Sequence, residues 1–134
     1  MKIKFIRGKF TEEQKSHFNI SGSKGPDYSS YFTVDKNYIV LGITHISESN
    51  SYNTTLVDLH DDIGNCTSVP ICLTEIIDPR PSVFWRAKII NNDLVLWPIE
   101  FYQDFFHDDL SEGIPHVKRI FDSVVYRLTH EFKE

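Results

Sequence analysis

The sequence contains little cysteine, glycine or proline, and it has no long apolar run. With 2 Cys, 6 Gly and 6 Pro in 134 residues, it is neither a disulfide scaffold, nor collagen-like, nor a flexible linker. The longest apolar runs, such as 38–41 and 94–97, are far shorter than the roughly 18 residues of a membrane-spanning helix. The first residues carry charges where a signal peptide has its apolar core. We therefore expect a cytoplasmic protein that does not associate with a membrane.

Basic residues are missing from a long central stretch. Residues 37–79 contain six Asp or Glu but no Lys or Arg, and the formal net charge of the chain is -5. Non-specific binding to nucleic acids depends on Lys and Arg that displace counterions from phosphates. We therefore expect no direct contact with nucleic acid, and the uneven distribution of charge indicates an acidic surface.

Motifs for metal binding or catalysis are also missing. Cys66 and Cys72 have no second cysteine pair and no histidine at zinc-finger spacing, so they are expected to be buried thiols. His-Asp-Asp occurs at 60–62 and at 107–109. Consecutive side chains in a turn point in different directions, so we interpret both triplets as solvated acidic turns rather than metal sites. There is no G-x-S-x-G elbow and no phosphate-binding loop. We expect no enzymatic activity, no metal and no cofactor.

The residues that are present suit one globular domain covering 1–134. Hydrophobic residues make up 40% of the chain and aromatic residues 13%, which is enough for a sizeable core. Lys2–Phe5 alternates polar and apolar residues, as in a half-buried strand. Thr11 and Gln14 have capping-box spacing and predict a helix over 11–18. The Gly- and Ser-rich stretch that ends at Pro26 predicts a loop.

The middle of the chain is rich in Tyr, Val, Ile, Thr and Phe, which favours β structure. The candidate strands are 31–34, 38–47, 52–59 and 69–77. A hairpin is predicted from 82–90 and 94–97, because the intervening Asn91-Asn92-Asp93 tolerates left-handed backbone conformations.

The last third changes to a helical pattern. A short acidic helix is predicted over 101–110, and Gly113 should end it. Apolar residues then recur at helical spacing over 114–132, with Pro115 tolerated in the first turn. The predicted fold class is α+β: a mostly antiparallel sheet of about five to six strands packs against the C-terminal amphipathic helix, with short helices near 11–18 and 101–110.

Acidic and aromatic residues alternate before the C-terminal helix. Five carboxylates lie within 100–112 without a basic neighbour in that stretch, and like charges four residues apart on a helix repel unless a basic partner relieves them. The four aromatic residues of 101–106 cannot all face inward from one helix, so some are candidate anchors of an interface. A solvated face is the alternative. The predicted partner-binding residues are Asp58, Asp61, Asp62, Glu100, Asp104, Phe105, Asp108, Asp109 and Glu112.

The stretch Ser82-Val-Phe-Trp-Arg-Ala-Lys-Ile-Ile-Asn-Asn-Asp-Leu-Val-Leu-Trp-Pro98, with the acidic Phe-rich turn and amphipathic helix that follow it, resembles small bacterial immunity proteins. These proteins protect cells against the toxin domains of contact-dependent growth inhibition and related polymorphic toxin systems. The resemblance lies in length, acidity and α+β layout over about the last 55 residues. It implies that the chain binds a cognate toxin domain and blocks its basic substrate-binding or active-site surface. No catalytic residues are implied.

Three functional hypotheses follow. The first is an immunity protein whose acidic surface binds and neutralises a basic, nuclease-type toxin domain. The second is a small hydrolytic enzyme with a cleft of His and carboxylate side chains. The third is an accessory or oligomerisation domain that uses the aromatic residues of 101–106. The sequence leaves the oligomeric state open.

Overall fold

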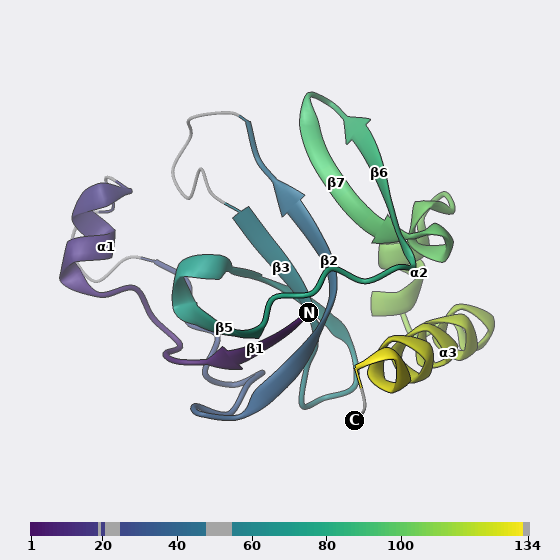
Figure 1. Cartoon of the computed structure of the whole chain (residues 1–134), viewed down its shortest axis with the longest axis horizontal. Coiled ribbons are helices and arrows are strands. Elements are labelled where there is room, and N and C mark those ends of the chain that lie inside the picture. Colours follow the sequence, from purple (N-terminus) through teal and green to yellow (C-terminus); the bar gives the residue numbers. More distant parts are fainter. Residues whose placement is uncertain (19, 21–24, 48–54, 133–134) are drawn as a thin grey trace.

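The structure, a computed structural model, describes residues 1–18, 20, 25–47 and 55–132 (Figure 1). Over these ranges it is an α+β fold with an antiparallel sheet of seven strands, slightly more than expected. Within the described ranges, no helix has the length and apolar character needed to cross a membrane. In chain order the elements are β1 (Lys2–Phe5), α1 (Glu12–His17), β2 (Asn37–His45), β3 (Thr55–His60), β4 (Cys66–Pro70), the 3-10 turn η1 (Ile71–Leu73), β5 (Thr74–Asp78), β6 (Trp85–Ile90), β7 (Asp93–Pro98), the 3-10 turn η2 (Ile99–Tyr102), α2 (Phe106–Ser111) and α3 (Pro115–Glu131).

Strand β2 is the branch point of the sheet. On one side it pairs with β3, and on the other side its first part pairs with β1 and its last part with β7. One path through the sheet therefore runs β4-β3-β2-β1-β5, while the β6–β7 hairpin leaves from the same strand. The indole N–H of Trp85 donates to the backbone oxygen of Leu41 at 2.9 Å. This bond satisfies a β2 carbonyl where the strand changes partners.

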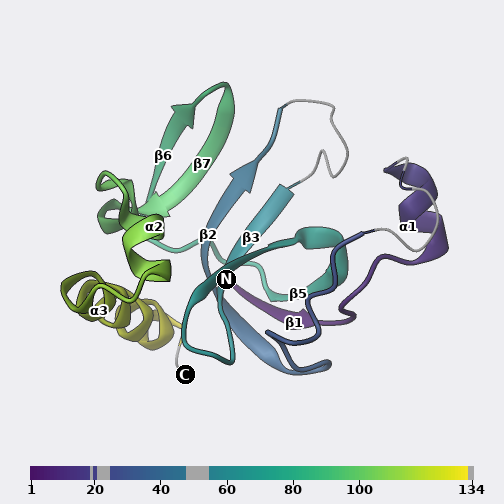
Figure 2. The ribbon, with the colours of Figure 1, turned by 180° about the vertical axis from the view of Figure 1, so that it is seen from behind.

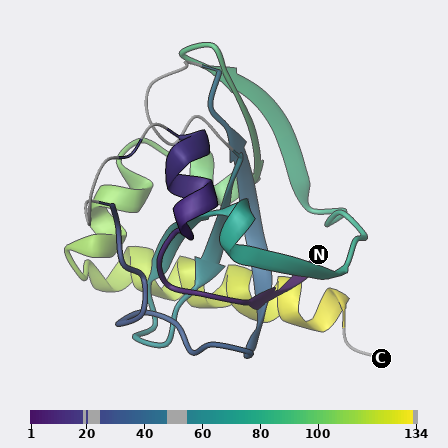
Figure 3. The same ribbon diagram turned by 90° about the vertical axis from the view of Figure 1, so that its left-hand side faces the viewer.

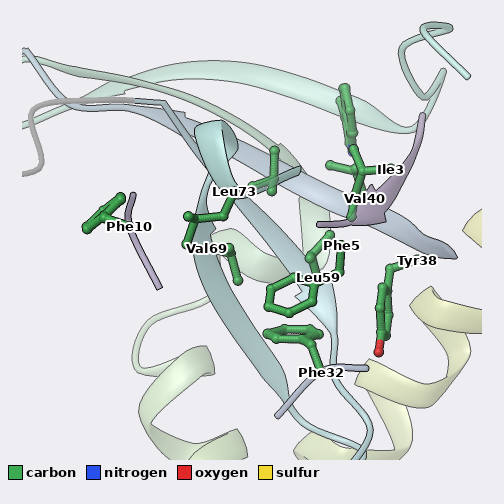
Figure 4. Packing of buried hydrophobic residues seen from close by; sticks show 11 residues of the cluster. Ile3, Phe5, Phe10, Phe32, Tyr38, Val40, Leu59, Val69 and Leu73 are labelled. Atoms are coloured by element: carbon green, nitrogen blue, oxygen red, sulfur yellow. The ribbon is translucent and has the colours of Figure 1, made fainter. Parts of the chain in front are cut away.

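Among the described residues, two hydrophobic clusters lie on opposite faces of β2, because Val40 and its neighbour Leu41 point to opposite sides and are both fully buried. Figure 4 shows most of the first cluster, which we call the strand core: Ile3, Phe5, Phe10, Phe32, Tyr38, Val40, Val57, Leu59, Val69, Leu73 and Trp85. The second, which we call the helix core, consists of Leu41, Phe101, Phe106, Leu110, Val117, Phe121, Val124 and Leu128.

Helices α2 and α3 lie at one end of the molecule beside the β6–β7 hairpin, and α1 lies at the opposite end (Figures 1 and 2). When α1 faces the viewer, α3 runs beneath the strands (Figure 3). The inward face of α3 carries the apolar stripe expected from the sequence, and Pro115 is in its first turn. The predicted packing of a C-terminal amphipathic helix against the sheet is therefore confirmed.

Two local predictions are confirmed in detail. At the start of α1, the Thr11 hydroxyl accepts from the Gln14 amide at 3.1 Å and the Gln14 side chain accepts from the Thr11 amide at 2.9 Å, which is a capping box. In the β6–β7 hairpin, Asn91 and Asn92 have φ values of 49° and 72°. Positive φ at both central residues gives a tight two-residue turn. The predicted hairpin is confirmed with shifted bounds, since its first strand begins at Trp85 and Asp93 belongs to β7 and not to the turn.

The prediction of a strand over 31–34 is wrong. This segment forms turns, and Tyr31 and Val34 are exposed. Its amides bond locally instead of to another strand: the Tyr31 amide donates to the backbone oxygen of Tyr28 at 3.0 Å, and the Thr33 amide donates to the Tyr38 hydroxyl at 2.8 Å. Two other strand predictions are shifted: the predicted strand 38–47 is observed over Asn37–His45, and the strand predicted over 52–59 is observed over Thr55–His60, with 52–54 outside the described residues. Most of the predicted 21–26 loop also lies outside them.

Two predicted elements are interrupted. The strand expected over 69–77 divides into β4 and β5, because the chain makes a 3-10 turn after Pro70 and moves from pairing with β3 to pairing with β1. The helix expected over 101–110 is replaced by η2 and α2. Phe105 lies between them in a left-handed conformation with φ of 62°, which a continuous α-helix does not contain. Asp104 and Asp108 therefore do not share one helical face.

Candidate functional site

Two of the predicted interface carboxylates are buried, so they cannot belong to an acidic surface. Asp58 is 3% exposed and Asp61 is 4% exposed. Asp61 accepts hydrogen bonds from the backbone amides of Ile63 and Asn65 and from the Thr67 hydroxyl, at 2.7–2.9 Å. Asp61 thus organises the turn between β3 and β4, where its oxygens replace water as partners of amides in the turn.

Two further carboxylates reach the surface but are bonded within the chain. Asp62 accepts from the Lys36 ammonium at 2.7 Å and from the hydroxyls of Thr33 and Tyr38, and the bond from Lys36 lowers the pKa of Asp62. Glu100 forms a two-bond ion pair with the Arg127 guanidinium at 2.8 and 2.9 Å. Hydrogen bonding from Arg127 lowers the pKa of Glu100. A basic partner 27 positions away compensates this charge, and the local sequence gives no sign of it.

The remaining predicted residues lie together in 104–112, which we call the docking segment. Asp104, Asp108 and Glu112 are exposed and Asp109 is half-buried, and none of the four forms an ion pair with a described Lys or Arg. Asp108 and Asp109 occupy the first turn of α2, where negative charge is favourable next to unpaired amides. Stabilisation of the helix therefore explains why Asp108 and Asp109 are acidic, but it does not explain the acidic residues at 104 and 112.

Phe105 is the most exposed aromatic side chain of the docking segment, at 73%. Its neighbours Phe101 and Phe106 are buried in the helix core. The prediction that the aromatic residues of 101–106 divide between core and surface is therefore confirmed. The left-handed backbone of Phe105 is unfavourable for a residue with a Cβ, and it directs the ring away from the helix core.

A buried polar cluster fastens the docking segment to the sheet. Asp58 on β3 accepts from the Ser68 hydroxyl at 2.5 Å and from the Trp97 indole N–H at 2.9 Å. Trp97 packs against the ring of His107 on α2, with 4.8 Å between centroids. Burial raises the pKa of Asp58, whereas burial lowers the pKa of His107 and outweighs the opposite effect of Asp58. No sequence pattern indicates this cluster, because its members are distant in sequence and no motif joins them.

A groove of about 590 Å³ lies between the β6–β7 hairpin and the start of the docking segment. Its lining combines aromatic rings with charged groups of both signs: Lys88, Trp97, Tyr102, Asp104, Phe105, His107 and Asp108 are among the lining residues. Trp97 and Tyr102 pack together with 5.2 Å between ring centroids. The groove is thus an aromatic depression bordered by carboxylates, and it is continuous with the docking segment.

Neither His-Asp-Asp triplet is the solvated acidic turn that the sequence predicted, because Asp61 is buried and residues 107–109 lie in α2. Burial lowers the pKa of His60, whose ring packs against Phe121, while His107 belongs to the polar cluster. Within the described ranges, no three His, Cys, Asp or Glu side chains are grouped in a way that could hold a metal ion. Cys66 and Cys72 are free thiols, and burial raises the pKa of both.

Comparison with known proteins gives no relatives: no family model, no curated protein and no solved structure matches the chain.

Proposed function

We propose that this protein is an immunity protein, which binds a cognate toxin domain and blocks its active or substrate-binding site. The toxin surface that it meets is basic, as in a nuclease. The docking segment makes the contact, through Asp104, Phe105, Asp108, Asp109 and Glu112. Asp58, Asp61, Asp62 and Glu100 are excluded from the proposed interface, because the first two are buried and the other two are bonded to Lys36 and Arg127.

The observation that supports the proposal most directly is an exposed phenylalanine among carboxylates without basic partners in the described chain. Interfaces concentrate binding free energy in a few central aromatic residues surrounded by polar groups. Phe105 matches such an anchor, since its ring is 73% exposed and its backbone is held in an unfavourable conformation. The isolated chain leaves this ring exposed to water, so a partner that covers the ring on binding gains the free energy of burying it.

The charges around Phe105 favour a basic partner. Unpaired carboxylates increase the rate of association with a basic patch and disfavour acidic partners. They add less to the final affinity. An inhibitor of a nuclease meets a surface that is built to attract phosphates, so acidic side chains on the inhibitor suit it.

The proposal is tested by reversing charge on the docking segment. We expect the tagged wild-type protein to retain one stoichiometric partner with a basic toxin domain, and to inhibit that toxin when the two are mixed. Asp104→Lys with Asp108→Lys should slow association about tenfold or more at low salt, because steering raises association rates by about 10–1000-fold. Surface plasmon resonance at two salt concentrations measures the rate.

The matched control is Glu13→Lys with Glu75→Lys. It makes the same change in net charge at exposed positions on α1 and β5, away from the docking segment (Figure 1). Equal association rates for the two double variants would contradict the assignment of the docking segment. Failure to retain or inhibit any toxin domain would contradict the immunity function itself.

One observation favours the hydrolytic enzyme as a second candidate. His107 lines the groove, and its ring packs against Trp97, whose indole N–H donates to the buried carboxylate of Asp58; a histidine with a nearby carboxylate is a common general base. In that case His107→Ala should abolish turnover of a substrate that the wild-type protein hydrolyses. The immunity function, in contrast, requires no turnover.

A further inference from the structure

The groove between the β6–β7 hairpin and the docking segment has the composition of a cation-binding site. Its aromatic side is formed by Trp97 and Tyr102, and Asp104 and Asp108 also line it. Aromatic faces attract cations, and Arg is the commonest protein partner in such contacts. Carboxylates next to such faces supply the charge-assisted hydrogen bonds that a guanidinium needs.

A cation already lies over one of these rings. The ammonium of Lys88 is 5.4 Å from the centroid of the Tyr102 ring. Lys88 comes from the exposed part of β6 and forms no ion pair with any described carboxylate. Little therefore holds the Lys88 side chain in place, and its long stem is able to move toward solvent when another cation enters.

The charges of the groove favour a positive occupant once Lys88 moves away. Asp104 and Asp108 contribute two negative charges without a described ion-pair partner. The lowered pKa of His107 favours its neutral form near neutral pH. A phosphate or an acidic peptide would have only Lys88 to pair with, and it would be repelled by both carboxylates.

We propose that this groove receives an arginine side chain from the basic partner protein. The guanidinium stacks against the Tyr102 and Trp97 side and pairs with Asp104 or Asp108, in place of Lys88, while Phe105 covers the stem of the arginine. Arginine fits better than lysine because its planar group both stacks on rings and binds carboxylates through two donors. This inference rests on the proposed function, since it names the group that the toxin domain contributes.

The test uses peptides and does not require the toxin. Acetylated and amidated Gly-Gly-Arg-Gly-Gly is titrated into the ¹⁵N-labelled full chain, and the matched peptide has citrulline, which is neutral but similar in shape. The two indole N–H signals are the readout. Trp97 lies in the groove, while Trp85 is buried against Leu41 and serves as an internal control.

We expect the arginine peptide to shift the Trp97 signal saturably, with little change at Trp85 and at least about threefold weaker binding of the citrulline peptide. Asp104→Asn with Asp108→Asn should weaken arginine binding about threefold to tenfold, and Lys88→Met should strengthen it about twofold to threefold. Glu13→Gln with Glu75→Gln is the control for lost negative charge. Lys2→Met is the control for a lost lysine.

Equal binding of the two peptides would overturn the inference, as would shifts of equal size at both indoles or an unchanged affinity in the Asp104→Asn/Asp108→Asn variant. None of these results depends on the toxin, so failure of the groove is distinguishable from failure of the proposed function. If the arginine peptide binds as expected but no toxin domain is retained, the immunity function is wrong and the arginine does not come from a toxin.

Discussion

At the scale of single residues, the surroundings decide what each carboxylate does. Asp61 and Asp62 are neighbours in sequence, yet Asp61 is buried and accepts hydrogen bonds inside a turn, while Asp62 is exposed and binds Lys36. Asp58 bonds to Ser68 and Trp97 in the interior. A count of acidic residues therefore overestimates the acidic surface, since a buried carboxylate presents no charge to a partner.

His107 should make the stability of the protein depend on pH. Burial lowers its pKa in the folded state, whereas the unfolded value is about 6.5. The contribution of His107 is thus complete above about pH 6.5 and is lost as the pH falls through the folded-state pKa. We expect the free energy of unfolding to fall less from pH 7 to 5 in His107→Phe than in the wild type. Urea unfolding at several pH values measures this difference.

The control for His107→Phe is the exposed histidine in His116→Gln. Asp58 has the opposite sign: its pKa is raised, so its contribution is lost as the pH rises through the folded-state value. The informative quantity is therefore the difference between the variant and the wild type in how the free energy of unfolding depends on pH, and not that dependence in either protein alone. Identical pH dependence in His107→Phe and the wild type would contradict the burial of a neutral His107.

Phe105 should lower the stability of the protein through its backbone conformation and contribute to binding through its ring. Phe105→Ala and Phe105→Gly both remove the exposed ring, but only glycine adopts a φ of 62° without cost. We expect the glycine variant to be more stable than the alanine variant by about 1 kcal/mol, and both to lose affinity for the toxin equally. Thermal unfolding gives the first comparison and binding kinetics the second. Equal stability of the two variants would show that this backbone conformation is not strained.

At the scale of elements, β2 is the central strand of the described sheet, because it pairs with three strands and both of its faces are buried. Gly42 lies where β2 changes from β1 to β7 as its partner. A Cβ at this position would lie 2.5 Å from a ring carbon of Trp97 and 3.0 Å from the backbone oxygen of Leu96. The indole must approach β2 this closely for its N–H to reach Asp58.

We expect Gly42→Ala to destabilise the protein by about 1–3 kcal/mol and to shift the Trp97 indole N–H signal. Chemical denaturation and the NMR spectrum measure the two effects. Gly113→Ala is the comparison: its Cβ would meet nothing within 4 Å, although its φ is 74°. That variant should cost about 1 kcal/mol without moving the indole signal. An unchanged Trp97 signal in Gly42→Ala would contradict the described contact.

At the scale of the whole molecule, β2 joins the strand core and the helix core into one cooperative unit. Removing the buried ring in Phe121→Ala should destabilise the protein by about 3–5 kcal/mol. Tyr126→Ala on the same helix should change stability by less than about 0.5 kcal/mol, because Tyr126 is 65% exposed.

Because the two cores share β2, we expect a single unfolding transition. Far-ultraviolet circular dichroism and tryptophan fluorescence should both show it at the same denaturant concentration. Two separate transitions in Phe121→Ala would contradict the shared core.

Features that depend on neighbouring residues were predictable from the sequence alone. The capping box of Thr11 and Gln14, the Asn91-Asn92 turn and the apolar stripe of α3 are all confirmed. Each is a local pattern, since a cap spans one helical turn, a hairpin turn needs two residues with positive φ, and an amphipathic helix repeats every 3.6 residues. The α+β class followed from these patterns.

Strand pairing and the exposure of the carboxylates depend instead on contacts between distant segments. The segment 31–34 has the residues of a strand, but its amides bond within a turn and to the Tyr38 hydroxyl. Glu100 was compensated by a guanidinium 27 positions away, and Asp58, Trp97 and His107 came together from β3, β7 and α2. Pairing, burial and long-range ion pairs depend on distances between segments far apart in the chain, and local patterns carry no information about such distances.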